Sequence, residues 1–346
     1  MRITRACLPR ELRASVAAAA LAAVVGCGGA ARNESPPEPD AGPRPAPPVR
    51  LTGAVRAVIE LPGVTGLSDL TTDDAGNLWA VAERNRVLVR MNADGSAPQA
   101  IRLEGVPPGL DVEGITWLGN DRFALATESD DPRRTSDLML FARLVDAGAR
   151  ILVERKVVLD YGIWPLSPLG NQGIEGLCVA GDSIVASIES AVGGPASRFA
   201  PVAVHDLEGG GWTPYLVRLT TVTGKLSAVS CRLRGDAIDV MAVERHFAVA
   251  HLIRFQLPAH RDRAGPRPPP PQIEPVLVAD LAALLEHQEN FEGLVWDGER
   301  AIALIVDNDW ATVTGPNLLV RARLSGPAPA SQAAPPSASP AARPRR

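Results

Sequence analysis

Acidic side chains recur at two fixed positions along this chain. A Glu-Gly pair occurs in three similar segments, at Glu113-Gly114, Glu175-Gly176 and Glu292-Gly293. The next apolar run of each segment ends in a second acid, and these acids are Glu128, Glu189 and Asp307. Two further segments carry Ser68 and Ser227 at the first position and Glu83 and Glu244 at the second. Carboxylates in such numbers could bind a hard cation or transfer protons.

The segments that carry these acids form a repeat. From Leu51 to Leu324 the apolar runs are short, alternating, rich in Val, Ile and Leu, and separated by Gly, Asp and Asn, which indicates strands. Only residues 281–288 have helical character. Successive segments are 45 to 65 residues apart, the limits being the steps from Ser68 to Glu113 and from Ser227 to Glu292. Such steps suit four-stranded propeller blades and disfavour a β-sandwich.

The two ends of the repeat region are expected to meet in one blade. After the fifth segment only residues 318–324 remain before a Pro-rich tail, so the outer strand of the last blade must come from residues 54–61. This pairing closes the ring and removes its open edge. The sequence therefore predicts an all-β fold, a β-propeller of five four-stranded blades closed by the N-terminal strand, with six blades as the alternative. The Pro-rich run 266–271 is expected in a surface loop of the fourth blade.

The propeller geometry brings the acids together. The innermost strand of each blade lines the central channel, and the end of the second strand lies beside the start of the first. The expected mouth acids are Glu83, Glu113, Glu128, Glu175, Glu189, Glu244, Glu292 and Asp307. So many carboxylates repel one another unless cations, Arg or protonation offset their charge, and Ca²⁺ is the expected cation. The other interpretation is that Glu before Gly caps a tight turn and that the strand-end acids are solvated or paired with Arg.

The N-terminus has the features of an export signal. Several Arg residues precede the apolar run 16–25, which is too short to span a membrane. It ends in Val24-Val25-Gly26-Cys27, which resembles a bacterial lipobox, although a chance Cys in an Ala/Gly-rich stretch is the alternative. We expect a signal peptide over 1–26, a lipid on Cys27, a Pro-rich tether over 27–50, a propeller over 51–324 and a disordered tail over 325–346. The protein would be a monomer anchored in the bacterial cell envelope, on the periplasmic or outer-membrane side.

Charge and cysteine content exclude some functions. The formal net charge of −4 argues against nucleic acid as a partner. Of four Cys residues, Cys7 leaves with the signal and Cys27 is the anchor. Cys178 and Cys231 could form a disulfide or could be two small buried thiols. No Cys-x-x-Cys or His-x-x-x-His spacing occurs, so a zinc site is not indicated.

Five motifs, taken in order, resemble a known family. They are Asn77-Leu78-Trp79-Ala80-Val81, Asp111-Val112-Glu113-Gly114-Ile115, Asn171-Gln172-Gly173-Ile174-Glu175-Gly176-Leu177, Val243-Glu244-Arg245, and Asn290-Phe291-Glu292-Gly293-Leu294 with Asp307-Asn308. Together they are similar to the phytase-like propeller family, described as having esterase-like activity of phytase. The resemblance implies an exported propeller that hydrolyses phosphate or other esters. The first and fourth blades depart from the pattern, with Ser68-Asp69 and Ser227-Ala228 in place of Glu-Gly.

A catalytic mouth would use these residues in distinct roles. Ca²⁺ held by Glu113, Glu175, Glu292 and Asp307 would polarise an ester oxygen and orient water. Glu189 or Glu128 would act as general base. Substrate would be bound by Arg84, Arg245, Asn171 and Asn308. No Gly-x-Ser-x-Gly elbow is present, and His246 is expected to be a surface or packed residue and not a general base. Two alternatives stay open: a non-catalytic propeller that binds a protein or glycan partner in the envelope, and a lactonase of the gluconolactonase type.

Overall fold

The computed structural model describes residues 50–164, 166, 170, 172–194, 197–246, 249–259, 269–285, 290–307, 309–310 and 313–325, with only the backbone at 50, 52, 84, 284–285, 309–310 and 313–314. Cys27, most of the tether and tail, Asn171, Asn308 and the Arg84 side chain lie outside this description. The chain divides into two units, Met1–Ala46 and Pro47–Arg346, and all described residues belong to the second. Among the described helices, none is long and apolar enough to span a bilayer.

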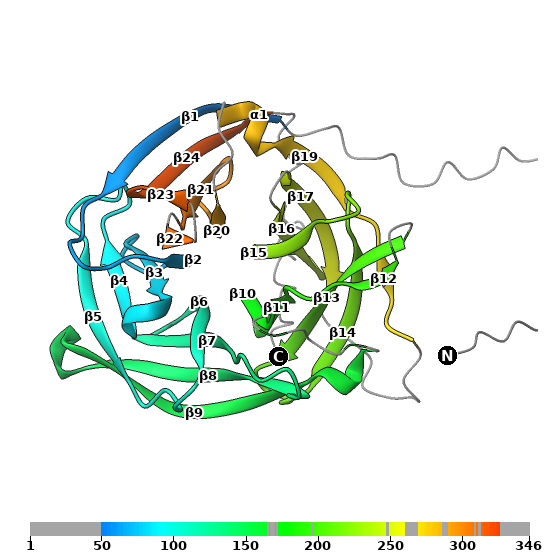
Figure 1. Cartoon of the computed structure of the whole chain (residues 1–346), viewed down its shortest axis with the longest axis horizontal. Coiled ribbons are helices and arrows are strands. Elements are labelled where there is room, and N and C mark those ends of the chain that lie inside the picture. Colours follow the sequence, from blue (N-terminus) through cyan, green and yellow to red (C-terminus); the bar gives the residue numbers. More distant parts are fainter. Residues whose placement is uncertain are drawn as a thin grey trace, which may run out of the picture. The chain divides into compact units, whose positions relative to one another are not determined.

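The described strands form five four-stranded antiparallel units arranged around an axis (Figure 1). From the axis outward, the units are β2 (Leu67–Thr72), β3 (Leu78–Ala82), β4 (Val87–Met91) and β5 (Gln99–Glu104); β6 (Asp111–Gly119), β7 (Arg122–Glu128), β8 (Ser136–Val145) and β9 (Arg150–Asp160); β10 (Ile174–Ala180), β11 (Ser183–Ile188), β13 (Ser197–Asp206) and β14 (Trp212–Arg218); β15 (Lys225–Arg234), β16 (Ala237–His246), β17 (Val249–Pro258) and β19 (Val276–Asp280); and β20 (Phe291–Trp296), β21 (Ala301–Val306), β24 (Asn317–Ser325) and β1 (Arg50–Ile59). We call these blades 1 to 5.

Short elements join or extend the blades. They are the 3-10 turns η1 (Glu83–Asn85), η2 (Asp146–Gly148) and η3 (Tyr161–Ile163), the strands β12 (Val192–Gly194), β18 (Gln272–Ile273), β22 (Asp309–Trp310) and β23 (Val313–Thr314), and the helix α1 (Leu281–Leu285). The helix lies within the segment predicted to be helical. Strand β18 pairs in parallel with β14, and β5 pairs in parallel with β9, so neighbouring blades also touch at their outer edges.

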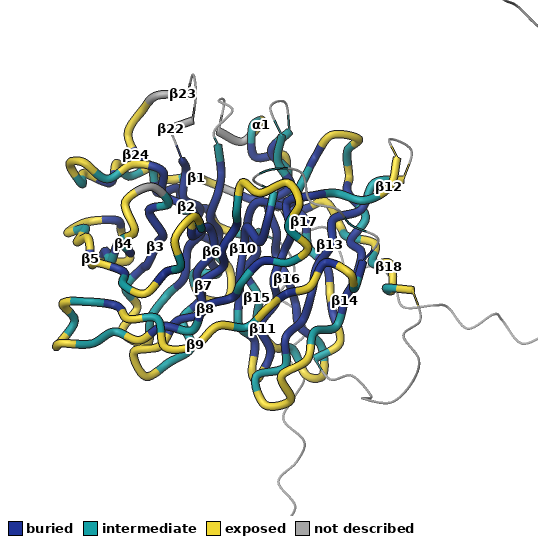
Figure 2. The backbone as a smooth tube through the Cα atoms, turned by 60° about the horizontal axis from the view of Figure 1, so that its bottom comes forward, coloured by how far each residue is buried: buried dark blue, intermediate teal, exposed yellow. Residues whose placement is uncertain are grey.

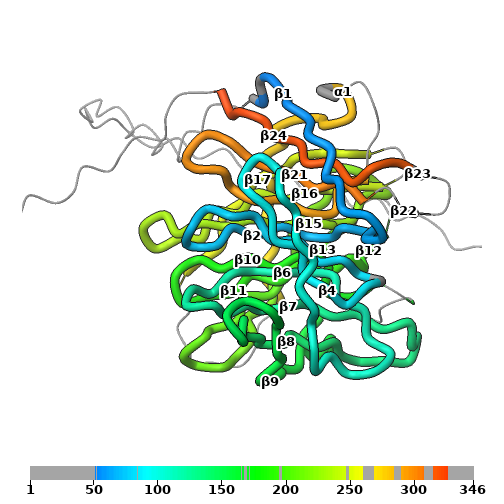
Figure 3. The backbone as a smooth tube through the Cα atoms, turned by 90° about the vertical axis from the view of Figure 1, so that its left-hand side faces the viewer, coloured from blue at the N-terminus to red at the C-terminus, as the bar shows by residue number. Residues whose placement is uncertain are grey.

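The N-terminal strand closes the ring, as predicted. Strand β1 pairs antiparallel with β24 from Arg50 and Ser325 to Ile59 and Asn317, and Figure 3 shows the two strands side by side. The first described strand of the chain is therefore the outer strand of the last blade. The prediction of an all-β propeller closed by its N-terminal strand is confirmed.

The hydrophobic core is divided among the gaps between blades. Each of five clusters of buried residues joins two neighbouring blades, and the fifth joins blade 5 back to blade 1. Both faces of a blade are therefore covered. This explains why strands such as β3 and β11 are buried at every position and mostly apolar instead of alternating. Figure 2 shows the inner strands buried and the connecting loops exposed.

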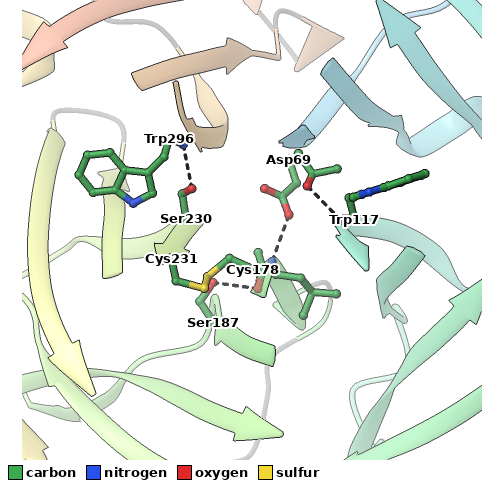
Figure 4. The surroundings of a disulfide bond; sticks show 10 residues. Asp69, Trp117, Cys178, Ser187, Ser230, Cys231 and Trp296 are labelled. Carbon is green, nitrogen blue, oxygen red and sulfur yellow. Dashed lines mark hydrogen bonds between the residues drawn. A yellow bond between two sulfur atoms is a disulfide. The ribbon is translucent and has the colours of Figure 1, made fainter. Parts of the chain in front are cut away.

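A disulfide links two inner strands. Cys178 in β10 is bonded to Cys231 in β15, with Cα atoms 5.5 Å apart (Figure 4). The sequence left this pairing open against two separate buried thiols. The bond crosslinks blades 3 and 4 close to the axis, and it joins the strands that carry Glu175 and Lys225.

Candidate functional site

The inner strand of each blade contains a β-bulge, and in blades 2, 3 and 5 the Glu-Gly pair marks it. Pairing between the first and second strands skips one residue in every blade. The skipped residues are Asp69, Glu113, Glu175, Ser227 and Glu292. A bulge leaves its extra residue outside the ladder and redirects the side chain. The three Glu-Gly pairs thus lie within strands and do not cap turns.

The glycine after the bulge permits close contact between inner strands. A Cβ atom on Gly114 would lie 2.9 Å from the Glu175 carbonyl oxygen, and one on Gly293 would lie 2.6 Å from the Asp69 carbonyl carbon. Both distances are shorter than van der Waals contact, and both neighbouring atoms belong to the next blade's backbone. The Glu-Gly pair therefore combines a redirected carboxyl group with a narrow approach between blades.

The acids at the ends of the second strands lie opposite residues that are two or three positions before the bulges. Glu128 is opposite Asp111, two residues before Glu113. The backbone N–H groups of Glu83, Glu189 and Asp307 donate to the carbonyl groups of Gly66, Gly173 and Asn290, respectively. We call the set formed by Glu83, Glu113, Glu128, Glu175, Glu189, Glu292 and Asp307 the carboxyl ring.

The members of the carboxyl ring are buried, except for the partly buried Glu83, and they influence one another. Glu113, Glu175 and Glu292 are each 5 to 6% exposed. Burial raises the pKa of Glu175 well above its usual range, and the charges of Glu189, Glu128, Glu113 and Glu292 raise it further. Within the described residues, the Glu175 carboxyl group makes no hydrogen bond or ion pair. A buried carboxyl group without a partner favours its protonated form.

Two members of the ring share a hydrogen bond. The carboxyl groups of Glu83 and Glu113 bond to each other. Burial, with the charges of Glu292 and Asp307, raises the pKa of Glu83 to about 8. Burial and the Glu83 charge raise the pKa of Glu113 well above its usual range. At neutral pH this pair therefore retains at least one proton, because two adjacent buried carboxylates cannot both ionise without a cation.

Blade 4 supplies cations to the ring. Arg245 binds the Glu292 carboxylate with two N–H groups, with Nε 3.0 Å from Oε2, and Asn290 Nδ2 lies 2.9 Å from Oε1. Lys225 forms an ion pair with Glu189, and Arg245 Nη2 lies 3.9 Å from the same carboxylate. Burial still raises the pKa of Glu292 to about 7, although Arg245 opposes the shift. Arg245 thus contacts the carboxyl ring, where its main partner is Glu292, and its expected role in binding substrate stays a prediction.

Glu244 does not belong to the mouth, and the prediction that placed it there is wrong. Its carboxylate is fully buried and accepts hydrogen bonds from the backbone N–H and hydroxyl groups of Thr220 and Thr221, at 2.7 to 3.0 Å. In blade 4, Lys225 lies two residues before the bulge, and it pairs with Arg245. The longer β15–β16 hairpin shifts the register by one residue, so Arg245 occupies the place that an acid has in blades 2, 3 and 5. Lys225 was missed, although its place two residues before the bulge was available as a signal.

A second buried polar group lies beside Glu128. The Gly173 N–H donates to Glu128 Oε2 at 2.9 Å, while burial raises the pKa of Glu128 to about 7. Arg134 Nε lies 2.9 Å from Asp137 Oδ1, and the Tyr161 hydroxyl donates to Asp137. A cavity of about 390 Å³ is lined by Arg134, Thr135, Asp160, Tyr161, Gly162 and Leu166. These residues come from separate loops, so no spacing in the sequence could reveal them.

His246 lies at the edge of the cationic side and is partly buried. Burial and the charges of Lys225, Arg198 and Arg245 lower its pKa. These neighbours favour the neutral imidazole at physiological pH.

Three of the four predicted calcium ligands are bound to other groups, and Glu175 is the exception. Glu113 is bonded to Glu83, and Glu292 is held by Arg245 and Asn290. Asp307 Oδ2 lies 3.4 Å from Asn290 Nδ2. Among the residues described here, no three His, Cys, Asp or Glu side chains are arranged as a metal-binding group. The oxygen donors suit Ca²⁺ chemically, but their described arrangement does not fit a bound ion.

Comparison with known proteins gives one family match and a set of distant folds. A family model described as phytase-like, esterase-like activity of phytase, matches residues 62–310. No curated protein matches the chain. The PQQ-bound aldose sugar dehydrogenase of Streptomyces coelicolor is 11% identical, with a TM-score of 0.45 over 79% of this chain and 99% of its own. The allergen Mala s 1 of Malassezia sympodialis is 9% identical, with a TM-score of 0.47, and the match covers 78% of this chain and 96% of the allergen. A thermostable family-43 glycoside hydrolase is 11% identical, with a TM-score of 0.47, and the match covers 81% of this chain and 99% of the hydrolase.

Proposed function

The chain belongs to the phytase-like family, described by the esterase-like activity of phytase, and on that premise we propose that its carboxyl ring hydrolyses an ester by proton transfer between carboxyl groups. The observation that carries the proposal is the different partners of Glu175 and Glu189. Glu189 is ion-paired with Lys225, whereas Glu175 makes no hydrogen bond or ion pair among the described residues, and burial raises its pKa. A buried carboxyl group beside a second acid that is paired with a cation is an arrangement suited to acid–base hydrolysis.

The proposed reaction assigns a role to each member of this pair. Glu189, as the carboxylate, accepts a proton from water while the water oxygen bonds to the carbonyl carbon or phosphorus of the ester. Glu175, as the acid, donates its proton to the leaving oxygen when the ester bond breaks, which gives an acid and an alcohol. Afterwards the proton on Glu189 returns to Glu175 through water. Glu128, with a pKa of about 7, is the second candidate for the base.

The charge balance of the mouth limits the substrate class. Among the described side chains, Lys225 and Arg245 are the cations paired with the ring, and both already hold carboxylates. A densely charged anion such as phytate would leave this balance strongly negative. We therefore propose esters of low charge, either phosphate diesters or carboxylic esters, as the substrates.

A substrate screen with matched variants tests this function. The mature chain would be assayed on p-nitrophenyl acetate, p-nitrophenyl phosphate, bis(p-nitrophenyl) phosphate and gluconolactone. We expect hydrolysis of at least one ester, and loss of that activity in Glu175→Gln and Glu189→Gln with the melting temperature nearly unchanged. Glu299→Gln is the control, because Glu299 is an exposed surface acid. Absence of activity on every substrate, or full activity in both ring variants, contradicts the proposal.

Calcium is tested by its own arm of the same screen. When bound, Ca²⁺ would polarise the ester oxygen. Because Glu113, Glu292 and Asp307 are bound to other groups, no step of the proposed reaction runs through the ion. Assays with added Ca²⁺ and with EDTA, together with melting curves under both conditions, measure whether the ring binds it. A rise in melting temperature with Ca²⁺ that Glu175→Gln abolishes would make Glu175 a ligand and not the acid.

We further propose that the protein is exported and anchored through Cys27. The Cys178–Cys231 bond supports this location, because disulfides persist in oxidising compartments. Intact-mass analysis of the protein from a membrane fraction should give a lipid-modified N-terminus at Cys27, and Cys27→Ala should release the chain from the membrane. An unmodified Cys27 in the wild-type protein contradicts the anchor.

A further inference from the structure

Asp69 occupies the bulge of blade 1, where the Glu-Gly pattern is absent. Its side chain is fully buried, and its backbone adopts the left-handed region with φ 40. A non-glycine residue rarely adopts this conformation, and such residues are held in place by their surroundings. Figure 4 shows the Asp69 carboxylate in the space between the inner strands, directed toward the strand that carries Cys178.

The Asp69 carboxylate binds three strands at once. Its Oδ1 accepts the backbone N–H of Leu70 in its own strand at 2.8 Å. Its Oδ2 accepts the N–H groups of Ile115 in β6, at 2.8 Å, and of Leu177 in β10, at 3.1 Å. One carboxylate oxygen thus connects the inner strands of blades 2 and 3, while the residue itself belongs to blade 1. Backbone N–H donors are a strong match for a carboxylate.

The two amides have the same relation to the ring. Ile115 follows Glu113 by two residues, and Leu177 follows Glu175 by two residues, so Asp69 binds each strand directly after its bulge. At the same level the two strands approach closely, since Gly114 leaves no room for a Cβ beside Glu175. From this geometry we propose that Asp69 is a positioning residue, which fixes the separation of the Glu113 and Glu175 carboxyl groups. The inference rests on the proposed function in assigning a catalytic role to Glu175.

Ser227 provides the natural comparison. It occupies the bulge of blade 4 and is fully buried, as Asp69 is. Its hydroxyl donates to the Phe291 carbonyl group at 2.8 Å and so binds one neighbouring strand, β20. Loss of this bond would weaken one contact between blades, but it would not release the strands of Glu113 and Glu175. Ser227→Ala is therefore a control for the general effect of losing an inner-strand hydrogen bond.

The test compares Asp69→Ala, Asp69→Asn and Ser227→Ala in the full mature chain. For the ester found in the substrate screen, we expect kcat to fall about 10- to 100-fold in Asp69→Ala with little change in KM, as displacement of reacting groups by about 1 Å would cause. The pH profile of kcat should shift, because Glu113 and Glu175 affect each other's protonation. Asp69→Asn should recover most of kcat, since its amide oxygen can replace Oδ2. Ser227→Ala should stay within about two-fold of the wild type.

Amide hydrogen exchange at Ile115 and Leu177 is the readout that does not depend on activity. We expect both amides to exchange faster in Asp69→Ala and to stay protected in Ser227→Ala. Protection that is unchanged in Asp69→Ala overturns the proposal, whether or not the protein has activity. The proposal is also overturned if exchange rises while kcat and its pH profile match those of Ser227→Ala, because Asp69 would then support only stability. If the wild type hydrolyses no ester, the proposed function fails and the catalytic part of this inference fails with it, while faster exchange would still show that Asp69 holds the strands.

Discussion

Arg245 and Glu292 form a bidentate ion pair that joins blade 4 to blade 5 inside the carboxyl ring. The side chains are 18% and 7% exposed, so both charges have lost most of their water. Removing one partner leaves an unpaired buried charge, whereas replacing both leaves none. The pair therefore provides a direct test of how the ring balances its charge.

We predict that Arg245→Met lowers the free energy of unfolding by about 3 to 5 kcal/mol near neutral pH. The double variant Arg245→Met with Glu292→Met should recover most of this loss, because two apolar side chains then replace the pair. Urea unfolding of the wild type, both single variants and the double variant forms the required cycle. Equal losses in the single and double variants would contradict a coupled pair.

Stability should fall as the pH rises from about 5 to about 8. Burial raises the pKa of Glu83 to about 8 and the pKa values of Glu128 and Glu292 to about 7, so the folded state binds more protons than the unfolded chain in this window. Their contribution to stability is complete below the unfolded pKa and is lost as the pH passes the folded pKa. We expect a higher melting temperature at pH 5.5 than at pH 8.5, measured in EDTA. Glu83→Gln should flatten this dependence, and a rise toward pH 8.5 would show that the ring is ionised.

Glu244 should matter for stability and not for catalysis. Its carboxylate accepts four hydrogen bonds from Thr220 and Thr221, and an amide would oppose some of these donors with its own N–H groups. We expect Glu244→Gln to lower the free energy of unfolding by about 1 to 3 kcal/mol. Its kcat, measured well below the melting temperature, should equal that of the wild type. A large loss of kcat in the folded variant would contradict this prediction and show that Glu244 takes part in catalysis.

The Cys178–Cys231 bond should contribute strongly to stability. It closes a loop with a sequence separation of 53 residues, for which loss of chain entropy in the unfolded state predicts about 4 kcal/mol. Denaturant unfolding with and without reductant, and of the variant with both Cys residues replaced by Ser, measures this effect. Reductant should not change the double variant. Identical curves for the wild type with and without reductant would contradict the crosslink.

The sequence predicted the propeller because the information was local and repeated. Short apolar runs, turn residues and a regular step define the blades, and the missing outer strand could be assigned to residues 54–61, which lie in β1 and the turn that follows it. The regular position of the acids also located most of the carboxyl ring, because a residue's position along an inner strand determines its distance from the channel mouth.

The errors lie where register and tertiary contact decide. In blade 4 a longer hairpin exchanges Glu244 for Arg245 at the mouth. In blade 1 the bulge falls on Asp69, whereas the repeat pattern had placed the neighbouring Ser68 at this position. Neither shift changes the apolar pattern, so the sequence alone could not detect it. The contacts of Asp137 with Arg134 and Tyr161 exist only after folding, and no spacing predicts them.

Because β1 pairs with β24, the blade that closes the ring contains both the first and the last described strand of the chain. The earliest described strand emerges first but has no partner in its own blade until the last one has been made. Until β24 has been made, the chain can form only an open arc of blades, because β1 has no partner strand in blade 5. The ring therefore cannot close before β24 has been made, and truncation at either end of the domain would remove a strand from the same blade.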